Sequence, residues 1–246
     1  MNKTFCKKNH IFSLILAGCL ILFNLLLTSC GLDTFYVIDA PQARHMPSYS
    51  LDSQDELFFT FNTVENNYEG ITFLGTEVYY KIYNNSTRLN SETSRINLAA
   101  GNEGSSNQSA NLLIDTYTYQ PLRSSEDPGA NILIPFVKNN PSEKEIKIRL
   151  FDVPEYSAEY SINGNNHGIP IRSISKKTSF NFKELLGTED LPKGTEPYDD
   201  DYAYTSTSEV INEYYVALYA IAVARDTNYT PAYSSAVYLG SVRISL

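Results

Sequence analysis

The sequence predicts a mainly β protein built as a sandwich of short strands. Segments rich in aromatic and β-branched residues recur along the chain, and clusters of Asn, Ser, Gly and Pro separate them, which is typical of strands joined by turns. The clearest segment is 214–223, where apolar residues occupy both alternating faces. We predict that Val216, Leu218 and Ala220 face the core and that Tyr219 faces outward, since neighbouring side chains on a strand point to opposite sides.

The other elements follow from the same kind of pattern. The predicted strands are residues 35–38, 57–61, 77–83, 132–137, 145–151, 160–162, 169–174, 214–223 and 237–244. We expect the strands at 160–162 and 169–174 to form a hairpin around Asn163-Gly164, with a loop longer than two residues. Residues 86–119 contain few β-branched residues and predict two short helices around the loop 101–104. Residues 191–204 are rich in Pro, Gly and acids and predict a long exposed loop.

The last two predicted strands are similar to those that close a fibronectin type III domain. Tyr214, Val216 and Ala220 fit that family's Tyr-x-Val-x-x-x-Ala strand, a Ser- and Pro-containing turn follows, and residues 77–83 resemble its third strand. The family's early core tryptophan is missing, a role that Phe59 or Phe61 would fill. The resemblance implies an immunoglobulin-like sandwich over residues 35–246, with a large, partly helical insertion at about 85–213.

The beginning of the chain has the pattern of a secretory signal. Three lysines and no acids occupy the first ten residues, an apolar run covers 11–27, and the sequence Leu-Thr-Ser-Cys ends at Cys30. This arrangement resembles the lipobox of bacterial lipoproteins. The resemblance implies that Cys30 receives a diacylglycerol, that residues 1–29 are removed, and that residues 30–34 form a short tether to a membrane. Palmitate and other acyl chains on Cys30 would then hold the protein in the cell envelope.

An uncleaved membrane helix is the alternative for this segment. Crossing a bilayer takes about 20 apolar residues, and the run from 11 to 27 has 17 with Asn24 inside it. We therefore favour cleavage. Gly31 is not the aspartate that retains enteric lipoproteins at the inner membrane, so the resemblance favours the outer membrane.

Charge and cysteine content narrow the classes of partner. Of the 19 Lys and Arg, three precede Cys30 and none of the 28 Asp and Glu does, which leaves 16 against 28, a net charge of −12. Nucleic acid is not expected as a partner, since binding a polyanion needs a basic stripe. Cys6 and Cys19 leave with the signal, so we expect no disulfide and no thiol nucleophile.

Aromatic and histidine residues of the mature part allow two further expectations. All 19 tyrosines follow Cys30 and there is no tryptophan. We interpret the tyrosines as residues of strand edges and of the sandwich rim, with a binding surface as the alternative. A histidine-based site would have only His45 and His167 to use.

Sequence motifs for catalysis or metal binding are absent. Gly-x-Ser-x-Gly, His-Glu-x-x-His, the phosphate-binding loop and the EF-hand spacing do not occur. A looser calcium site from Asp199, Asp201 and Glu196 is the alternative to a solvated acidic loop, which we favour. We expect no catalytic residue, no metal site and no cofactor, and the sequence leaves the ligand-binding residues unknown.

The expected function is that of a lipid-anchored, non-catalytic binding module outside the cytoplasm. Its ligand classes would be a protein, a glycan or an envelope polymer. The alternatives are an accessory subunit of an envelope complex and a carbohydrate-active enzyme. A pocket with two close carboxylates would favour the enzyme, whereas a flat, tyrosine-rich exposed patch would favour binding.

Overall fold

The computed structural model describes residues 37–51, 53–65, 69–101, 106–138, 142–173, 179–182, 200–206 and 213–245. All of them belong to one compact unit, Val37–Leu246. The predicted signal 1–29, Cys30, the tether and the first half of the predicted strand 35–38 lie outside the described residues. Residues 37–38, the second half, are not in a strand.

Sheet A is antiparallel throughout. Its strands, in spatial order, are β1 (Gln42–His45), β2 (Phe59–Asn62), β7 (Glu145–Arg149), β8 (Glu159–Ile162) and β9 (Asn165–Asn166). The turn between β8 and β9 has φ of 50° at Asn163 and 76° at Gly164, as a two-residue hairpin turn requires. The prediction of a longer loop was wrong, because Asn-Gly closes the turn at once and residues 165–168 pair with β8 in place of 169–174.

Sheet B is built around two long strands, β3 (Ile71–Tyr83) and β12 (Glu213–Asp226), which pair with each other along most of their length. On the far side of β12 lie β14 (Val237–Ser245) and β13 (Pro231–Tyr233). The far edge of β3 is occupied by β4 (Gln120–Pro121), β6 (Ile134–Pro135) and the parallel β11 (Tyr202–Ala203). A two-stranded ribbon joins β5 (Arg123–Ser124) to β10 (Pro170–Ile171). The predicted strands at 77–83, 145–151, 214–223 and 237–244 are confirmed within these bounds.

Two glycines permit close crossings at sheet B. A Cβ on Gly75 would lie 2.2 Å from the carbonyl oxygen of Ile134, so glycine allows β6 to approach β3. A Cβ on Gly240 would lie 2.4 Å from the carbonyl oxygen of Pro47, where Ser241 donates a backbone hydrogen bond 2.9 Å long to that same oxygen. Pro47 thereby ties the chain after β1 to β14, and so links the two sheets at one edge.

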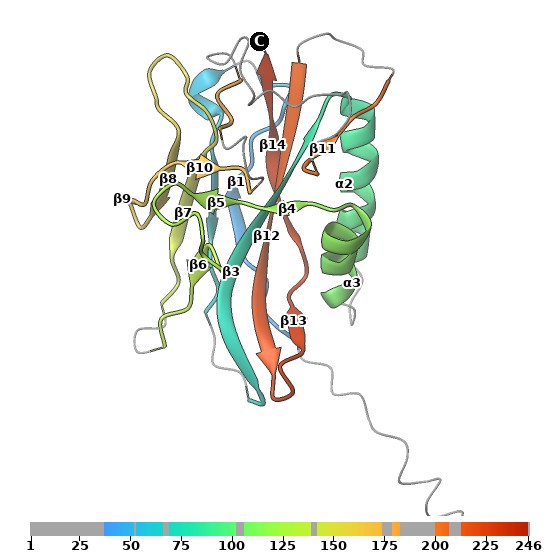
Figure 1. Ribbon diagram of the computed structural model, residues 1–246, viewed down its shortest axis with the longest axis vertical. Coiled ribbons are helices and arrows are strands. Elements are labelled where there is room, and N and C mark those ends of the chain that lie inside the picture. The colour runs from blue at the N-terminus through green and yellow to red at the C-terminus, as the bar shows by residue number, and fades with distance from the viewer. Residues whose placement is uncertain are drawn as a thin grey trace, which may run out of the picture. The chain divides into compact units, whose positions relative to one another are not determined.

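The described residues form three layers: sheet A, then sheet B, then the helices (Figure 1). The main apolar core lies between the sheets and is made of side chains from β2, β3, β7, β8, β12 and β14. The chain is therefore mainly β with antiparallel sheets facing each other, as the sequence predicted.

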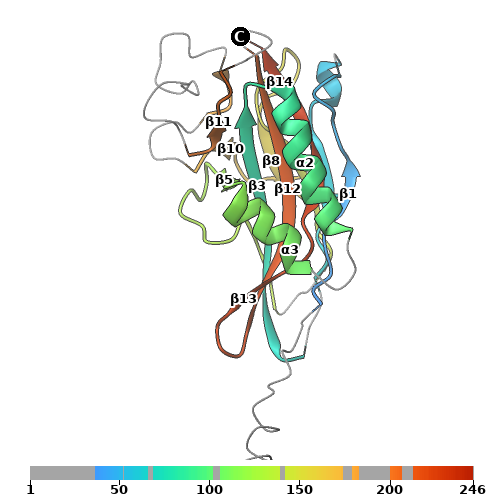
Figure 2. The ribbon, with the colours of Figure 1, turned by 90° about the vertical axis from the view of Figure 1, so that its right-hand side faces the viewer.

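Two helices cover the outer face of sheet B. They are α2 (Ser86–Ala100) and α3 (Ser106–Asn111), which continues into a π-helical turn at Leu112–Thr116, and they lie in front of β3 and β12 in Figure 2. Asn85 begins α2 because its side chain accepts a hydrogen bond of 2.9 Å from the backbone N–H of Arg88, which satisfies a free donor of the first turn. The prediction of two helices around 101–104 is confirmed.

This helical layer changes the interpretation of Tyr219. Leu218 points into the core between the sheets and Tyr219 into a second core beneath the helices, and both are 0% exposed. The Tyr219 hydroxyl donates to Asn97 Oδ1 at 3.1 Å and to the Thr93 carbonyl at 3.3 Å, both on α2. The prediction that Tyr219 points away from the core between the sheets was correct, but the helices that pack on that face shield its side chain from water.

The tyrosines follow the same pattern. Tyr80, Tyr83, Tyr119, Tyr160, Tyr202, Tyr215 and Tyr219 are buried. The expectation of tyrosines at strand edges and rims was wrong for these residues, because a phenol ring fills apolar space while its hydroxyl bonds to a polar group inside. The exposed tyrosines of the described ranges, Tyr156, Tyr204 and Tyr229, lie on three separate segments.

The range 85–213 contains more than a helical addition. Within it, β7 and β8 complete sheet A and supply Ile146, Ile148 and Tyr160 to the core between the sheets. The predicted insertion therefore contributes both the helical layer and two strands of the sandwich.

Variants of neighbouring residues on β12 test the double burial of this strand. We expect Leu218→Ala and Tyr219→Ala each to lower the free energy of unfolding by about 2–5 kcal/mol, since each leaves a cavity in a packed core. Tyr219→Phe keeps the ring and should cost about 1 kcal/mol, the contribution of a hydroxyl hydrogen bond. Urea unfolding of the three variants measures these costs. A Tyr219→Ala variant as stable as the wild type would contradict the burial of the outer face.

Candidate functional site

The acidic loop contains a buried residue. Asp201 is 0% exposed and receives two hydrogen bonds of 2.7 Å from Arg172, from Nε to Oδ2 and from Nη2 to Oδ1. Tyr80 donates a third, also 2.7 Å long, to Oδ2. The interpretation of Asp201 as part of a solvated loop was wrong, because its paired guanidinium and phenol replace the water that a carboxylate needs.

The calcium alternative receives no support from Asp201, whose oxygens already accept these bonds. Asp199 and Glu196 lie outside the described residues, and the described part of the chain has no cluster of three or more His, Cys, Asp or Glu side chains. Most of the predicted exposed loop 191–204 is likewise outside; its described end, 200–204, contains the short strand β11.

His45 and His167 lie apart and have different surroundings. His45, on β1, donates from Nε2 to the Glu56 carbonyl oxygen at 3.0 Å and stacks on the ring of Phe58 at 4.2 Å. His167 is exposed in the connection after β9. The structure does not bring them together into one site.

The buried Arg172–Asp201–Tyr80 network supports two aromatic side chains. Phe180 packs edge-on against the ring of Tyr80 at 5.1 Å, and the Arg172 guanidinium lies 5.9 Å from the ring centre of Phe182. Burial raises the pKa of Tyr80 well above its usual value, and the neighbouring Asp201 carboxylate adds to that rise. Tyr80 is therefore a neutral donor throughout the physiological pH range.

Phe180 and Phe182 form the floor of a pocket at one end of the sandwich, which we call the end pocket. Its volume is about 580 Å³, within the range of small-molecule sites. The apolar residues that line it are Leu51, Leu57, Phe151, Val153, Pro154, Phe180, Phe182 and Ile244. The polar residues that line it are Gln54, Asp152, Asn181, Arg243 and Ser245.

The polar wall of the end pocket is held in a fixed geometry. Asn181 Nδ2 donates to Asp152 Oδ2, and the backbone N–H of Asp152 donates to Asn181 Oδ1, both at 2.7 Å. The other carboxylate oxygen of Asp152 accepts from the backbone N–H of Ala158 at 2.6 Å. This reciprocal pair joins two segments far apart in sequence and presents amide and carboxylate groups beside aromatic rings. Such a combination suits a ligand with both polar and apolar faces.

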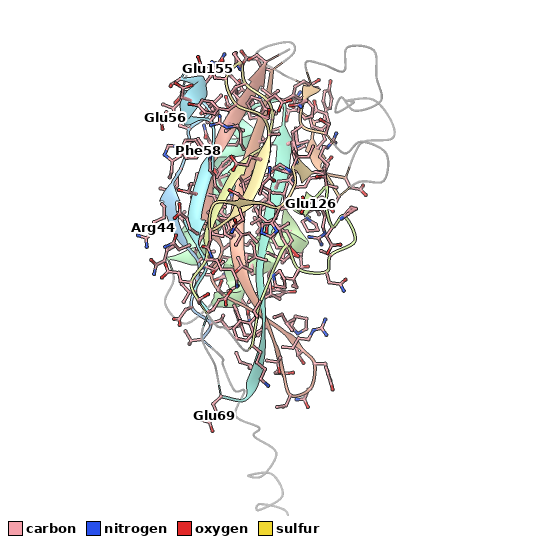
Figure 3. All side chains as sticks on the ribbon, turned by 90° about the vertical axis from the view of Figure 1, so that its left-hand side faces the viewer. Arg44, Glu56, Phe58, Glu69, Glu126 and Glu155 are labelled. Carbon is pink, nitrogen blue, oxygen red and sulfur yellow. The ribbon has the colours of Figure 1, made fainter. Side chains whose placement is uncertain are left out.

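The end pocket lies far from the point at which the described chain begins. Ile38 packs against Phe73, Ala222 and Ala224 at the opposite end of sheet B. Pocket residue Ile244 pairs with Tyr214. The strand from Tyr214 to Ala224 spans about 33 Å, at about 3.3 Å for each of ten steps. In Figure 3, Glu155 marks the end with the pocket and Glu69 marks the other end.

Among the described residues, neither the lining of this pocket nor that of the groove beside α2 contains the carboxylate pair that would favour a glycosidase. Asp152 is the one carboxylate of the described lining of the end pocket, and Glu92 is the one along the described part of the groove. Burial raises the pKa of Glu77 to about 7, against the opposing effect of Arg123, but Glu77 is 3% exposed and lines neither of them. A structural role in holding Arg123 accounts for it.

No known protein family, curated protein or solved structure matches the chain. Among the described residues, no helix is both long and apolar enough to cross a membrane.

The sequence did not indicate the residues of the end pocket. Asp152 follows a predicted strand by one residue, while Asn181 and its flanking phenylalanines belong to no predicted element. Their pairing joins positions about 30 residues apart, and no local pattern encodes it. The one available signal was the alternation Phe-Asn-Phe at 180–182, which places two rings on one side and an amide on the other.

Adjacent aspartates test the buried network behind the pocket. Asp201→Ala should lower the free energy of unfolding by about 3–5 kcal/mol, because it leaves the Arg172 guanidinium buried without its partner. Asp200→Ala removes an exposed carboxylate one residue earlier and should change it by less than about 0.5 kcal/mol. Thermal or urea unfolding of both variants gives the comparison. Equal stabilities would show that Asp201 is not buried as described.

Proposed function

We propose that the protein is a non-catalytic, lipid-anchored binding module that acts outside the cytoplasm and binds its ligand in the end pocket. The observation that carries this proposal is the pocket itself, in which the half-buried ring of Phe151 lies next to a rigid amide–carboxylate pair, over a floor of the buried Phe180 and Phe182. Aromatic faces and planar polar groups together recognise sugars and peptide segments, which have apolar and hydrogen-bonding surfaces side by side.

The position of the pocket agrees with attachment through Cys30. Ile38, eight residues after Cys30, is at most about 28 Å of extended chain from the lipid. It lies at the end of the unit opposite the pocket. A domain tethered in this way would have its pocket directed away from the membrane surface and open to soluble or wall-bound ligands. The lipid would supply the attachment, since a net charge of −12 gives no attraction to anionic lipids.

The strand arrangement supports an immunoglobulin-like variant of the sandwich as part of this proposal. In that fold strands A, B, E and D form one sheet and C, F and G the other. Here β1, β2 and β7 are neighbours in that order, and so are β3, β12 and β14. The difference is where the fourth strand of sheet A occurs in the sequence. By this matching β7 takes the place of strand E and β8 that of strand D, but β8 follows β7 along the chain, whereas strand D precedes strand E. In variable-type domains of that fold the loops after strands B and F contribute to the binding surface. The corresponding connections here, after β2 and after β12, lie at the end that Glu69 marks, so the end pocket is at the opposite end of the sandwich.

A blocking substitution tests binding in the pocket. Gln54 is exposed and lines the pocket, so Gln54→Trp should fill the space and lower saturable binding to isolated cell-envelope material by about tenfold, equivalent to losing one good contact. Gln42→Trp, on exposed β1, is the matched control and should bind like the wild type.

Co-sedimentation with the envelope fraction measures this binding, and pretreatment of that fraction separates the ligand classes. Protease sensitivity would identify a protein ligand and periodate sensitivity a glycan. Absence of saturable binding, or equal effects of the two tryptophans, would refute the proposal for the pocket.

The anchor is tested independently. Cys30→Ala should move the protein from the membrane fraction to the soluble fraction and abolish incorporation of labelled palmitate, because the thiol that accepts the lipid is gone. Cys19→Ala, within the predicted signal, is the control and should leave labelling intact. Labelling that persists in Cys30→Ala would exclude this cysteine as the site.

A further inference from the structure

A second recess lies along the first half of α2, and polar and charged residues line it. This α2 groove has a volume of about 660 Å³. Arg88, Ser91, Glu92 and Arg95 of the helix line one side, and Tyr117 and Thr205 line the other. It faces away from the core between the sheets and shares no lining residue with the end pocket.

The positive charges of the groove exceed its negative ones. Glu92 is already paired twice, with Lys81 Nζ at 3.1 Å from Oε2 and with Arg88 Nε at 2.8 Å from Oε1. Arg95 is exposed, and its side chain has no ion pair or hydrogen bond with the described residues. The groove thus has a net positive charge, although the predicted mature part of the protein has a net charge of −12.

The arginine at the start of the groove is held in place. Arg88 donates through Nε to Glu92 and through Nη1 to the Tyr204 carbonyl at 2.9 Å. Its guanidinium is therefore oriented before any ligand arrives, which reduces the entropy lost on binding. Arg88, Ser91 and Arg95 are three and four residues apart and occupy one face of α2, so the Ser91 hydroxyl lies between the two cations.

The opposite side of the groove is also fixed. Asn84 bonds to the backbone N–H and carbonyl of Thr205, each at 2.8 Å. The hydroxyl oxygen of Thr205 is buried and has no hydrogen-bond partner in the described structure. Below the groove, Lys81 donates to the Tyr117 carbonyl as well as to Glu92. Both walls are therefore positioned by contacts that do not involve a ligand.

From this geometry we propose that the α2 groove binds an oxyanion on a polyhydroxylated ligand, a sugar that carries phosphate or carboxylate. Arg95 and the free side of the Arg88 guanidinium would bind the oxyanion, since guanidinium groups match both chemistries through paired N–H donors. Ser91, which is exposed, would bond to a ligand hydroxyl. The volume accommodates one or two sugar rings. Tyr117 is the one aromatic residue among the described residues that line the α2 groove, whereas Phe151, Phe180 and Phe182 line the end pocket.

Titration of the purified full-length protein in detergent with glucose 6-phosphate, glucuronate and glucose tests the proposal. Both anionic sugars should bind at least about tenfold more tightly than glucose, the difference expected for one charge-assisted contact. Arg95→Gln should abolish this preference by weakening both anionic sugars about tenfold. The control, Arg225→Gln, removes an exposed arginine at the far end of β12 and should leave all three affinities unchanged.

The outcomes separate the sources of the oxyanion and can overturn the proposal. Weakening of glucose 6-phosphate alone in Arg95→Gln would assign a phosphate ligand, and weakening of glucuronate alone a carboxylate ligand. Equal binding of glucose, equal effects of the two arginine variants, or no binding of either anionic sugar at 10 mM, taken as roughly the upper limit for a specific site, would refute the groove as an oxyanion site. The Gln54→Trp variant should bind all three sugars like the wild type, which separates this test from that of the end pocket.

Discussion

Sheet B is covered on both faces, and this constraint governs much of the rest of the structure. Sheet A lies over one face and the helices over the other, so β12 is buried from Tyr215 to Ala224. A strand that is buried on both faces must have apolar residues on both, whereas a strand with one exposed face alternates apolar and polar residues. Tyrosine meets this need on the helical side, where its ring fills space and its hydroxyl bonds to α2 or to another tyrosine.

The long strand β3 attaches the later parts of the chain to this sheet through buried polar groups. Tyr80 bonds to Asp201, which pairs with Arg172 and fixes the segment that leads into β11. Lys81 pairs with Glu92 of α2, and Glu77 pairs with Arg123 of β5. Burying charges costs free energy that only close pairing offsets, so these pairs specify which segments lie against β3 more than they add stability.

The two recesses are products of these attachments. The network at Asp201 supports the floor of the end pocket, and the ion pairs of Glu92 fix the guanidinium that begins the α2 groove. One is aromatic with a rigid polar wall, and the other is polar and positively charged. A module with two such recesses would recognise an amphipathic ligand at one and an acidic sugar at the other. Both proposals fit a protein of the cell envelope, where glycans and their acidic derivatives are accessible.

Local patterns in the sequence predicted the elements that depend on neighbouring residues. The alternation at 214–223, the helices on either side of 101–104 and the mainly β class all follow from periodicity and turn chemistry, which act over a few positions. The lipobox resemblance at Cys30 is equally local and stays a prediction. The sequence did not indicate that Asp201 is buried, that Tyr219 lies under a helix, or that Asp152 faces Asn181. Each of these depends on a partner that is distant in the chain, and a side chain's exposure is decided only when the layers pack together.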